Sequence, residues 1–449
     1  MITLKQCRGI GLVIVGVLSS LLSGQALAES YVYLTNNTMQ TLTLSTQQTG
    51  HTNIRHGDEW QQLAAEVPPL GTVKFLRFNR DQGIKWGKEY IFTTVVNGAS
   101  EPVYLKQKLL GTSTFSQMWL SGQDDPWHYD RDIHRVPLID QQQTLAFKSS
   151  SARASGDDIR YVIHETFNKS EKSQYSNELN VLTYNTWALL PPLASKNTGD
   201  RLDTIAEYMT DYDVVVFQEV FDPILTAKFR EKVAKTYPYM TEIPWQVGRV
   251  LTGGSFIASR WPIEAQDAAV YDACRADGCF ASKGMNYAKI RKGSHAFHIF
   301  GTHTHAYTSE QDVTVRFEQL AQLKRFIESK QIPYQEPVIM AGDFNVDKIN
   351  YPQEHVAFLE LLNATEPEAT GAYPYSYAGS VNLYADDAFN EYLDYVLYSN
   401  DHIAPYASEN NMLTPRSIDS QHWQSWDLSD HYPVEGRFAF PLAPEYMLY

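Results

Sequence analysis

The sequence predicts two domains, an all-β sandwich or barrel followed by a layered α/β domain. Its 449 residues are too many for one ordinary domain. From residue 29 to residue 167, short segments alternate apolar with polar residues and are separated by Gly, Asn and Asp. From residue 179 to residue 449, continuous apolar runs alternate with segments of helical spacing. The polar stretch 168–178 between the two regions is expected to be a linker.

The N-terminal region is expected to consist of strands. Segments with strand character are residues 31–36, 41–47, 72–79, 90–98, 103–110, 144–150 and 159–167. The histidines of this region (His51, His56, His128 and His134) are scattered along the sequence, which indicates no metal site or nucleophile. The sequence therefore leaves the role and the ligand of this domain open.

The second region is expected to contain apolar strands and three helices. The strands are residues 180–187, 213–220, 253–261, 285–291, 296–305, 337–346, 392–399 and 431–440. The helices are residues 199–212, 224–237 and 309–330. This mixture over so long a region predicts a domain with a core of its own.

The first 28 residues have the pattern of an export signal. Lys5 and Arg8 precede an apolar run, and the small residues at 26–28 suit cleavage before Glu29. The protein is therefore expected to be secreted or periplasmic. Two cysteines follow the signal, Cys274 and Cys279, and cysteines this close in an exported protein are expected to form a disulfide. A zinc site is the alternative, but no further ligands lie at finger spacing.

The net charge bears on the class of partner. The formal charge is −15 at pH 7. A protein that binds nucleic acid through phosphate contacts usually presents a basic face, so the acidic chain disfavours nucleic acid as a partner. It also argues against simple electrostatic adhesion to anionic membranes.

Polar residues occur where the apolar strands of the second region begin or end. Each has an ordinary explanation when taken alone, such as a helix cap or an Asx turn. Their joint occurrence is harder to explain, because carboxylates rarely adjoin buried strands unless they are paired or bind a metal. The set comprises Asn185, Glu219, His303, Asp343, Asn345, Asp394, Asp430 and His431.

The chemistry of this set fits metal-assisted phosphodiester hydrolysis. Carboxylate and amide oxygens without thiolates suit a hard cation such as Mg²⁺. Histidine titrates near neutrality and can take a proton from water, while a neighbouring carboxylate orients the ring. A metal, a base and an orienting amide together suit phosphodiester hydrolysis, in which negative charge builds on the phosphoryl oxygens.

The order of the motifs resembles the endonuclease/exonuclease/phosphatase superfamily, which has the DNase I-like fold. The segments that carry this likeness are "TYNTW", "FQEVFD", "GTHTHA", "GDFNV", "LDYV" and "SDHYPV". Within the superfamily, "CRADGCFASKGMNYAKI" and "NVDKIN" are similar to the bacterial neutral sphingomyelinases C. The resemblance implies a four-layer α/β sandwich of two packed mixed sheets, with the site at one edge.

The resemblance also implies a role for each matching residue. Glu219 is the main ligand of Mg²⁺, for which Mn²⁺ or Co²⁺ can substitute, and Asn185 lies beside it. His431 is the general base. Asp394 and Asp430 orient His431 and help to bind metal or water. Asp343 and Asn345 position the water and the phosphate. His303 binds the phosphoryl group and, as one of two candidates with metal-bound water, protonates the leaving alkoxide.

The chain departs from its haemolytic relatives before the last motif. Those relatives carry a long aromatic hairpin that inserts into membrane, and the corresponding segment here, residues 415–433, is short. Trp423 and Trp426 remain in it, and they are expected either to contact membrane or to be core residues.

The resulting expectation is a secreted, Mg²⁺-dependent phosphodiesterase that cleaves sphingomyelin to ceramide and phosphocholine after peripheral contact with a membrane. Another choline phospholipid is the alternative partner. One alternative keeps the fold and acts on nucleic acid as a secreted nuclease. Another alternative is a membrane- or glycan-binding protein with an inactive phosphodiesterase domain. The sequence does not indicate the oligomeric state.

Overall fold

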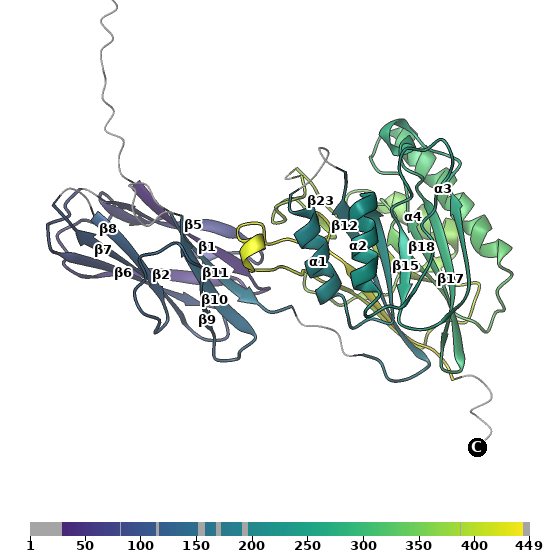
Figure 1. Cartoon of the computed structure of the whole chain (residues 1–449), viewed down its shortest axis with the longest axis horizontal. Coiled ribbons are helices and arrows are strands. Elements are labelled where there is room, and N and C mark those ends of the chain that lie inside the picture. The colour runs from purple at the N-terminus through teal and green to yellow at the C-terminus, as the bar shows by residue number, and fades with distance from the viewer. Residues whose placement is uncertain are drawn as a thin grey trace, which may run out of the picture.

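The computed structural model describes residues 29–80, 82–113, 116–150, 158–167, 172–190, 196–386 and 388–442. The predicted export signal lies outside these residues. The chain forms a strand-rich N-terminal domain and a second domain with helices on its outer faces (Figure 1). The fold class expected from the sequence is therefore confirmed. No helix among the described residues is long and apolar enough to cross a membrane.

The N-terminal domain is a sandwich, since its strands divide between two separate sheets. The six-stranded sheet has the order β3 (Trp60–Gln62), β5 (Thr72–Asn79), β1 (Glu29–Asn37), β11 (Ile159–Glu165), β10 (Gln143–Ser149), β9 (His134–Pro137). The five-stranded sheet has the order β4 (Glu66–Val67), β2 (Leu42–Gly50), β6 (Glu89–Asn97), β7 (Val103–Gly111), β8 (Ser116–Gly122). Alternating burial along β6 and β7 turns one face of each strand toward a shared core that includes Phe75, Phe92 and Tyr161.

Two further sheets form the second domain. The seven-stranded sheet has the order β14 (Tyr239–Met240), β15 (Phe256–Ser259), β13 (Val214–Val220), β12 (Glu178–Ala188), β26 (Val434–Ala439), β25 (Ala407–Met412), β21 (Glu368–Ala369). Its six-stranded neighbour has the order β16 (Ile263–Val270), β17 (Gly284–Lys292), β18 (His295–His303), β19 (Val338–Asp343), β24 (Asp394–Ser399), β20 (Ala364–Thr365). A small pair, β22 (Tyr377–Ala378) and β23 (Asn390–Glu391), lies outside both.

The two sheets of this domain pack face to face, and helices cover their outer faces. Val181 and Val216 of the first sheet share a core with Ile299 and Ile339 of the second. Helices α1 (Thr198–Tyr208) and α2 (Pro223–Val233) lie on the seven-stranded sheet, and α3 (Glu310–Ser329) and α4 (Pro352–Leu362) lie on the other (Figure 1). The four layers implied by the resemblance are therefore present.

The N-terminal domain contacts the segment between β25 and β26. The short helix η2 (Ser420–His422), yellow in Figure 1, lies between the two domains. Trp426 is 3% exposed and packs in one apolar cluster with Ala146 and Val162 of the sandwich. The buried Arg416 side chain donates to the Asn37 side chain at 2.9 Å.

This interface decides between the two expectations for the tryptophans. Trp426 is a core residue at the domain boundary, and Trp423 packs half-buried against its ring at 5.1 Å between centroids. The core expectation is therefore confirmed for Trp426, and its expected membrane contact is wrong, because the sandwich covers this side chain.

Candidate active site

The predicted polar residues converge at one edge of the second domain. Strands β12 and β13 are parallel neighbours in one sheet, and β18 and β19 are parallel neighbours in the other. Parallel strands present their carboxyl ends at the same edge, so residues that follow them meet there. Six of the eight predicted residues line one cavity of about 440 Å³: Glu219, His303, Asp343, Asn345, Asp430 and His431.

Asp343 lies at the centre of the group. Strand pairing places it opposite His303 on β18 and opposite Asp394 on β24. Its Oδ2 accepts a hydrogen bond from the Asn185 amide at 3.0 Å, and its Oδ1 accepts from the Asn345 backbone N–H at 3.0 Å. Burial, followed by the charge of Asp394, raises the pKa of Asp343 to about 6.

His431 and Asp394 form a buried base–carboxylate pair. His431 Nδ1 lies 2.8 Å from Asp394 Oδ2, so Nδ1 carries the proton and donates it to this bond. The Nε2 atom is left facing the cavity, 3.9 Å from Asp343 Oδ2. Burial alone would lower the pKa of His431, but the charge and hydrogen bond of Asp394 outweigh it and raise the pKa well above its usual range.

Glu219 and Asp430 form an acidic corner of the same cavity. Glu219 is the penultimate residue of β13 and has φ 58°, a left-handed conformation that is uncommon for a residue with a side chain and that occurs often at functional sites. Burial, followed by the charge of Asp430, raises the pKa of Glu219 to about 7. Two carboxylates buried this near each other disfavour their charged forms unless a cation lies between them.

The donor set at this corner fits a hard divalent cation. Glu219 and Asp430 supply carboxylate oxygens, and Asn185 supplies an amide oxygen that accepts from the Trp187 N–H at 3.1 Å. Oxygen donors of this kind are the ligands that Mg²⁺ prefers. A second group with neighbouring donor atoms comprises Asp343, Asp394 and His431. That group includes an imidazole, whereas Mg²⁺ prefers oxygen donors alone, so the acidic corner is the better place for a Mg²⁺ ion.

Lys283 was missed by the sequence analysis as a site residue. Its ammonium donates to His303 Nε2 at 2.8 Å and to the Thr304 carbonyl at 2.9 Å. Burial lowers the pKa of His303 well below its usual range, and the Lys283 charge adds to the shift. His303 is therefore neutral and accepts at Nε2. The Lys283 ammonium is then a positive charge beside His303, whereas the resemblance implies that His303 itself binds the phosphoryl group and donates the proton.

Aromatic and acidic side chains line the outer part of the cavity. Trp187, Tyr307, Tyr351, Tyr377 and Phe389 contribute rings, and Asp386 and Glu391 contribute carboxylates. Burial, followed by the charge of Asp347, raises the pKa of Glu391 to about 7. Rings and carboxylates together suit a ligand that carries a weakly hydrated cation.

The predicted disulfide between Cys274 and Cys279 is present. It closes the loop that contains the short helix η1 (Ala276–Cys279), which precedes Lys283. Within this loop, Asp277 accepts a hydrogen bond from Tyr307 of the cavity wall at 2.8 Å. The disulfide is therefore structural, and it supports one wall of the site.

Comparison with known proteins agrees with this geometry. Residues 182–431 match the model of the Endonuclease/Exonuclease/phosphatase family. Sphingomyelinase C from Bacillus cereus is 33% identical over 315 residues, which are 60% of this chain and 92% of that protein. The match to the family model begins after the β-sandwich, which therefore lies outside it.

Two solved structures are similar to the second domain. Sphingomyelinase C from Streptomyces griseocarneus aligns with a TM-score of 0.54 and 28% identity over 58% of this chain and 99% of that one. A variant of beta toxin from Staphylococcus aureus, with bound magnesium ions, aligns with a TM-score of 0.52 and 28% identity over 58% and 99% of the two chains.

Proposed function

This chain belongs to the endonuclease/exonuclease/phosphatase family and, within it, to the sphingomyelinase C group, and we propose that it hydrolyses sphingomyelin to ceramide and phosphocholine. That it is a phosphodiesterase follows from the family. The observation that carries the proposal is the single cavity that joins the His431 base, the acidic corner and an aromatic wall.

His431 acts as the general base in the proposed mechanism. Its Nε2 takes a proton from the attacking water, and Asp394 accepts from Nδ1 throughout, so the ring keeps its tautomer and the developing imidazolium is stabilised. Asp343 is fixed by its two hydrogen bonds and holds the water or the phosphate beside Nε2. A bound cation would offset the charge of the surrounding carboxylates and so lower the pKa of His431 toward its usual range.

Glu219, Asn185 and Asp430 would hold the Mg²⁺ ion, in place of which Mn²⁺ or Co²⁺ can serve. When bound, the ion withdraws charge from the phosphoryl oxygens and the departing alkoxide. The chain's own contribution is the Lys283 ammonium beside His303, together with the Asn345 amide, which donates to the Thr304 carbonyl at 3.2 Å. These donors stabilise negative charge in the transition state.

The aromatic wall supports a choline headgroup. A quaternary ammonium cannot donate hydrogen bonds and is recognised by aromatic faces and carboxylates. Tyr351, Tyr377 and Phe389 offer such faces, and Asp386 and Glu391 offer negative charge in the same cavity. A nuclease would instead need basic side chains for a phosphate backbone, and the acidic wall disfavours this.

We expect the purified chain to release phosphocholine from sphingomyelin in mixed micelles with Mg²⁺, and to stop when EDTA is added. Phosphatidylcholine, phosphatidylethanolamine and supercoiled DNA serve as competing substrates in the same buffer, and the products are identified by mass spectrometry. Absence of phosphocholine under these conditions would refute the lipid assignment, and DNA nicking at a comparable rate would favour the nuclease.

An apolar rim beside the cavity is the proposed contact with the membrane. The rim comprises Trp245, Val247, Val250 and Phe280, whose exposed fractions run from 60% to 81%. Backbone hydrogen bonds from residues 250 and 251 to the Phe280 carbonyl join the loop of the first three to the disulfide loop. The disulfide loop in turn contacts Tyr307 of the cavity wall. Exposed apolar groups of this kind mark interaction surfaces.

The rim predicts a difference between membrane-bound and soluble substrates. Replacing Trp245 and Phe280 together by Ser should lower kcat/KM on sphingomyelin vesicles by roughly 10-fold or more, because burying such side chains in lipid contributes about 1.5–3 kcal/mol each. Turnover of a soluble short-chain analogue should be unchanged. Ile139→Ser is the matched control, since Ile139 is 74% exposed but lies on the sandwich. Equal losses on both substrates would rule out a membrane role for the rim.

Export is also part of the proposal. The signal pattern of residues 1–28 and the disulfide between Cys274 and Cys279 both support a secreted or periplasmic location. The acidic chain would then reach its lipid through the apolar rim rather than through charge.

A further inference from the structure

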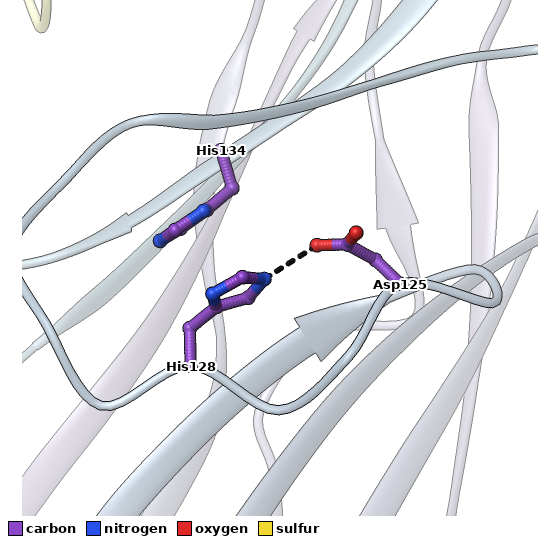
Figure 2. A group of neighbouring side chains, drawn as sticks. All are labelled: Asp125, His128 and His134. Atoms are coloured by element: carbon purple, nitrogen blue, oxygen red, sulfur yellow. Dashed lines mark hydrogen bonds and ion pairs between the residues drawn. The ribbon is translucent and has the colours of Figure 1, made fainter.

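A second cluster of metal-ligating side chains lies in the β-sandwich, far along the chain from the site described above. Asp125 and His128 belong to the connection between β8 and β9, and His134 is the first residue of β9 (Figure 2). One donor atom from each residue lies within 4.8 Å of the other two. His128 and His134 lie apart in the sequence but meet in the structure, because the connection folds back on itself.

The two imidazoles lie face to face between two carboxylates. Their ring centroids are 3.5 Å apart with an interplanar angle of 22° (Figure 2). Asp125 Oδ2 is 2.6 Å from His128 Nε2, and Asp130 Oδ1 is 2.7 Å from His134 Nε2. The two rings and the two carboxylates therefore form one compact group of metal-ligating side chains.

The surrounding strands hold the cluster in place. The backbone of His128 exchanges two hydrogen bonds with Leu120 of β8, and the Ser121 hydroxyl donates to the Asp125 carbonyl at 2.7 Å. His134 pairs with Phe147 of β10, and both histidine rings pack against the Phe147 ring. Backbone pairing and ring packing therefore hold the three donor residues in place, unlike side chains that move freely on a surface.

We propose that Asp125, His128 and His134 bind a divalent transition metal ion of the Zn²⁺ type. Imidazole nitrogens with a carboxylate oxygen are the donors that Zn²⁺ takes, whereas Mg²⁺ prefers oxygen alone. The ion replaces the proton shared by Asp125 and His128. Asp130 accepts from His134 and orients its ring, as carboxylates next to metal-binding histidines usually do. Two neutral imidazoles and two carboxylates balance a charge of +2.

The ion would tie together the edges of the two sheets. Strand β8 is the last strand of the five-stranded sheet, and β9 is the last strand of the six-stranded sheet. Next to His134, Ile133 packs on the interdomain cluster and Arg135 donates to the Ile418 carbonyl at 2.7 Å. Binding of the ion is therefore expected to stabilise the sandwich and the segment that carries it against the second domain.

The test is Zn²⁺ binding by the full chain in the presence of excess Mg²⁺. Equilibrium dialysis with elemental analysis should give one Zn²⁺ per chain, and the thermal unfolding midpoint should rise on addition of Zn²⁺. His128→Ala and His134→Ala should each lose that equivalent and the rise in midpoint, whereas His56→Ala, which replaces an exposed histidine of the same domain, should keep both.

Two further variants separate loss of the proposed site from misfolding and from Zn²⁺ binding at the active site. Asp125→Asn preserves the side-chain shape and should weaken Zn²⁺ binding at least 10-fold even if a histidine variant fails to fold. Glu219→Gln should retain the Zn²⁺ equivalent, because that residue belongs to the other site. An unchanged stoichiometry in folded His128→Ala and His134→Ala would overturn the proposal, and loss of Zn²⁺ in Glu219→Gln alone would place the ion at the active site.

Discussion

Replacing His431 by Ala is expected to reduce sphingomyelin turnover by about 10²- to 10⁴-fold, the range that a positioned general base supplies. His431 is the one histidine whose ring is held by a carboxylate through Nδ1 while Nε2 faces the cavity, among the described residues that line it. Without the ring, the attacking water has no acceptor for its proton at that position. The measurement is kcat for phosphocholine release at saturating Mg²⁺.

A matched control separates the base from the fold. His402→Ala removes a half-buried histidine from the turn after β24 and should leave kcat unchanged. Asp394→Asn should retain the fold but lower kcat, because the neutral amide does not stabilise the imidazolium and can present its NH₂ group to Nδ1, which favours the wrong tautomer. If folded His431→Ala keeps activity within a few-fold of the unaltered chain, the proposed base is wrong.

The site was predictable where polar residues interrupt a strong apolar pattern. Glu219 and Asp343 each end a run of buried residues, so their positions at strand ends could be read directly from the sequence. Parallel strands then bring such ends together. Lys283 gives no such signal, because it precedes a strand and is one lysine among many. Its contact with His303 depends on the antiparallel pairing of β17 with β18, which no local pattern specifies.

In the fold, too, elements with a local apolar pattern were predicted, and those that depend on distant contacts were not. Strands β2, β6 and β7 were found because one face of each is buried and the other is not. Strand β25 was not, because its sequence "ASENNM" has no apolar alternation and pairs with β26 through its backbone. The burial of Trp426 was undecided, since its partners on the sandwich lie more than 250 residues away and only the packed domains bring them together.

The cluster of His128 and His134 shows most clearly what sequence spacing does not predict. Their spacing matches no familiar metal motif, and the two residues attach to edges of different sheets. Only the path of the connection between β8 and β9 decides whether their rings meet. Spacing predicts ligand sets within one helix or one tight turn, and it loses that power when the ligands are brought together by sheet packing.

Replacing Glu219 by Gln is expected to separate catalysis from stability. The amide keeps the shape of the side chain but removes one negative charge from the acidic corner, so the ion loses its main ligand. The concentration of Mg²⁺ at half-maximal activity should rise. The value of kcat should fall by more than the roughly 10- to 100-fold seen when a residue that only hydrogen-bonds to a metal ligand is replaced. Glu231→Gln, at an exposed position on α2, should change neither quantity.

The same substitution should leave the fold intact or strengthen it when no metal is present. Burial beside Asp430 raises the pKa of Glu219 to about 7, which means that folding disfavours its charged form relative to the unfolded chain. At pH 8 the carboxylate is charged in both states, so the folded state bears this cost in full, and a neutral amide removes it. In EDTA the midpoint of thermal unfolding of Glu219→Gln should therefore equal or exceed that of the unaltered chain. A marked drop in the midpoint would show that Glu219 is needed for folding, whereas normal kcat with normal Mg²⁺ dependence would exclude it as the metal ligand.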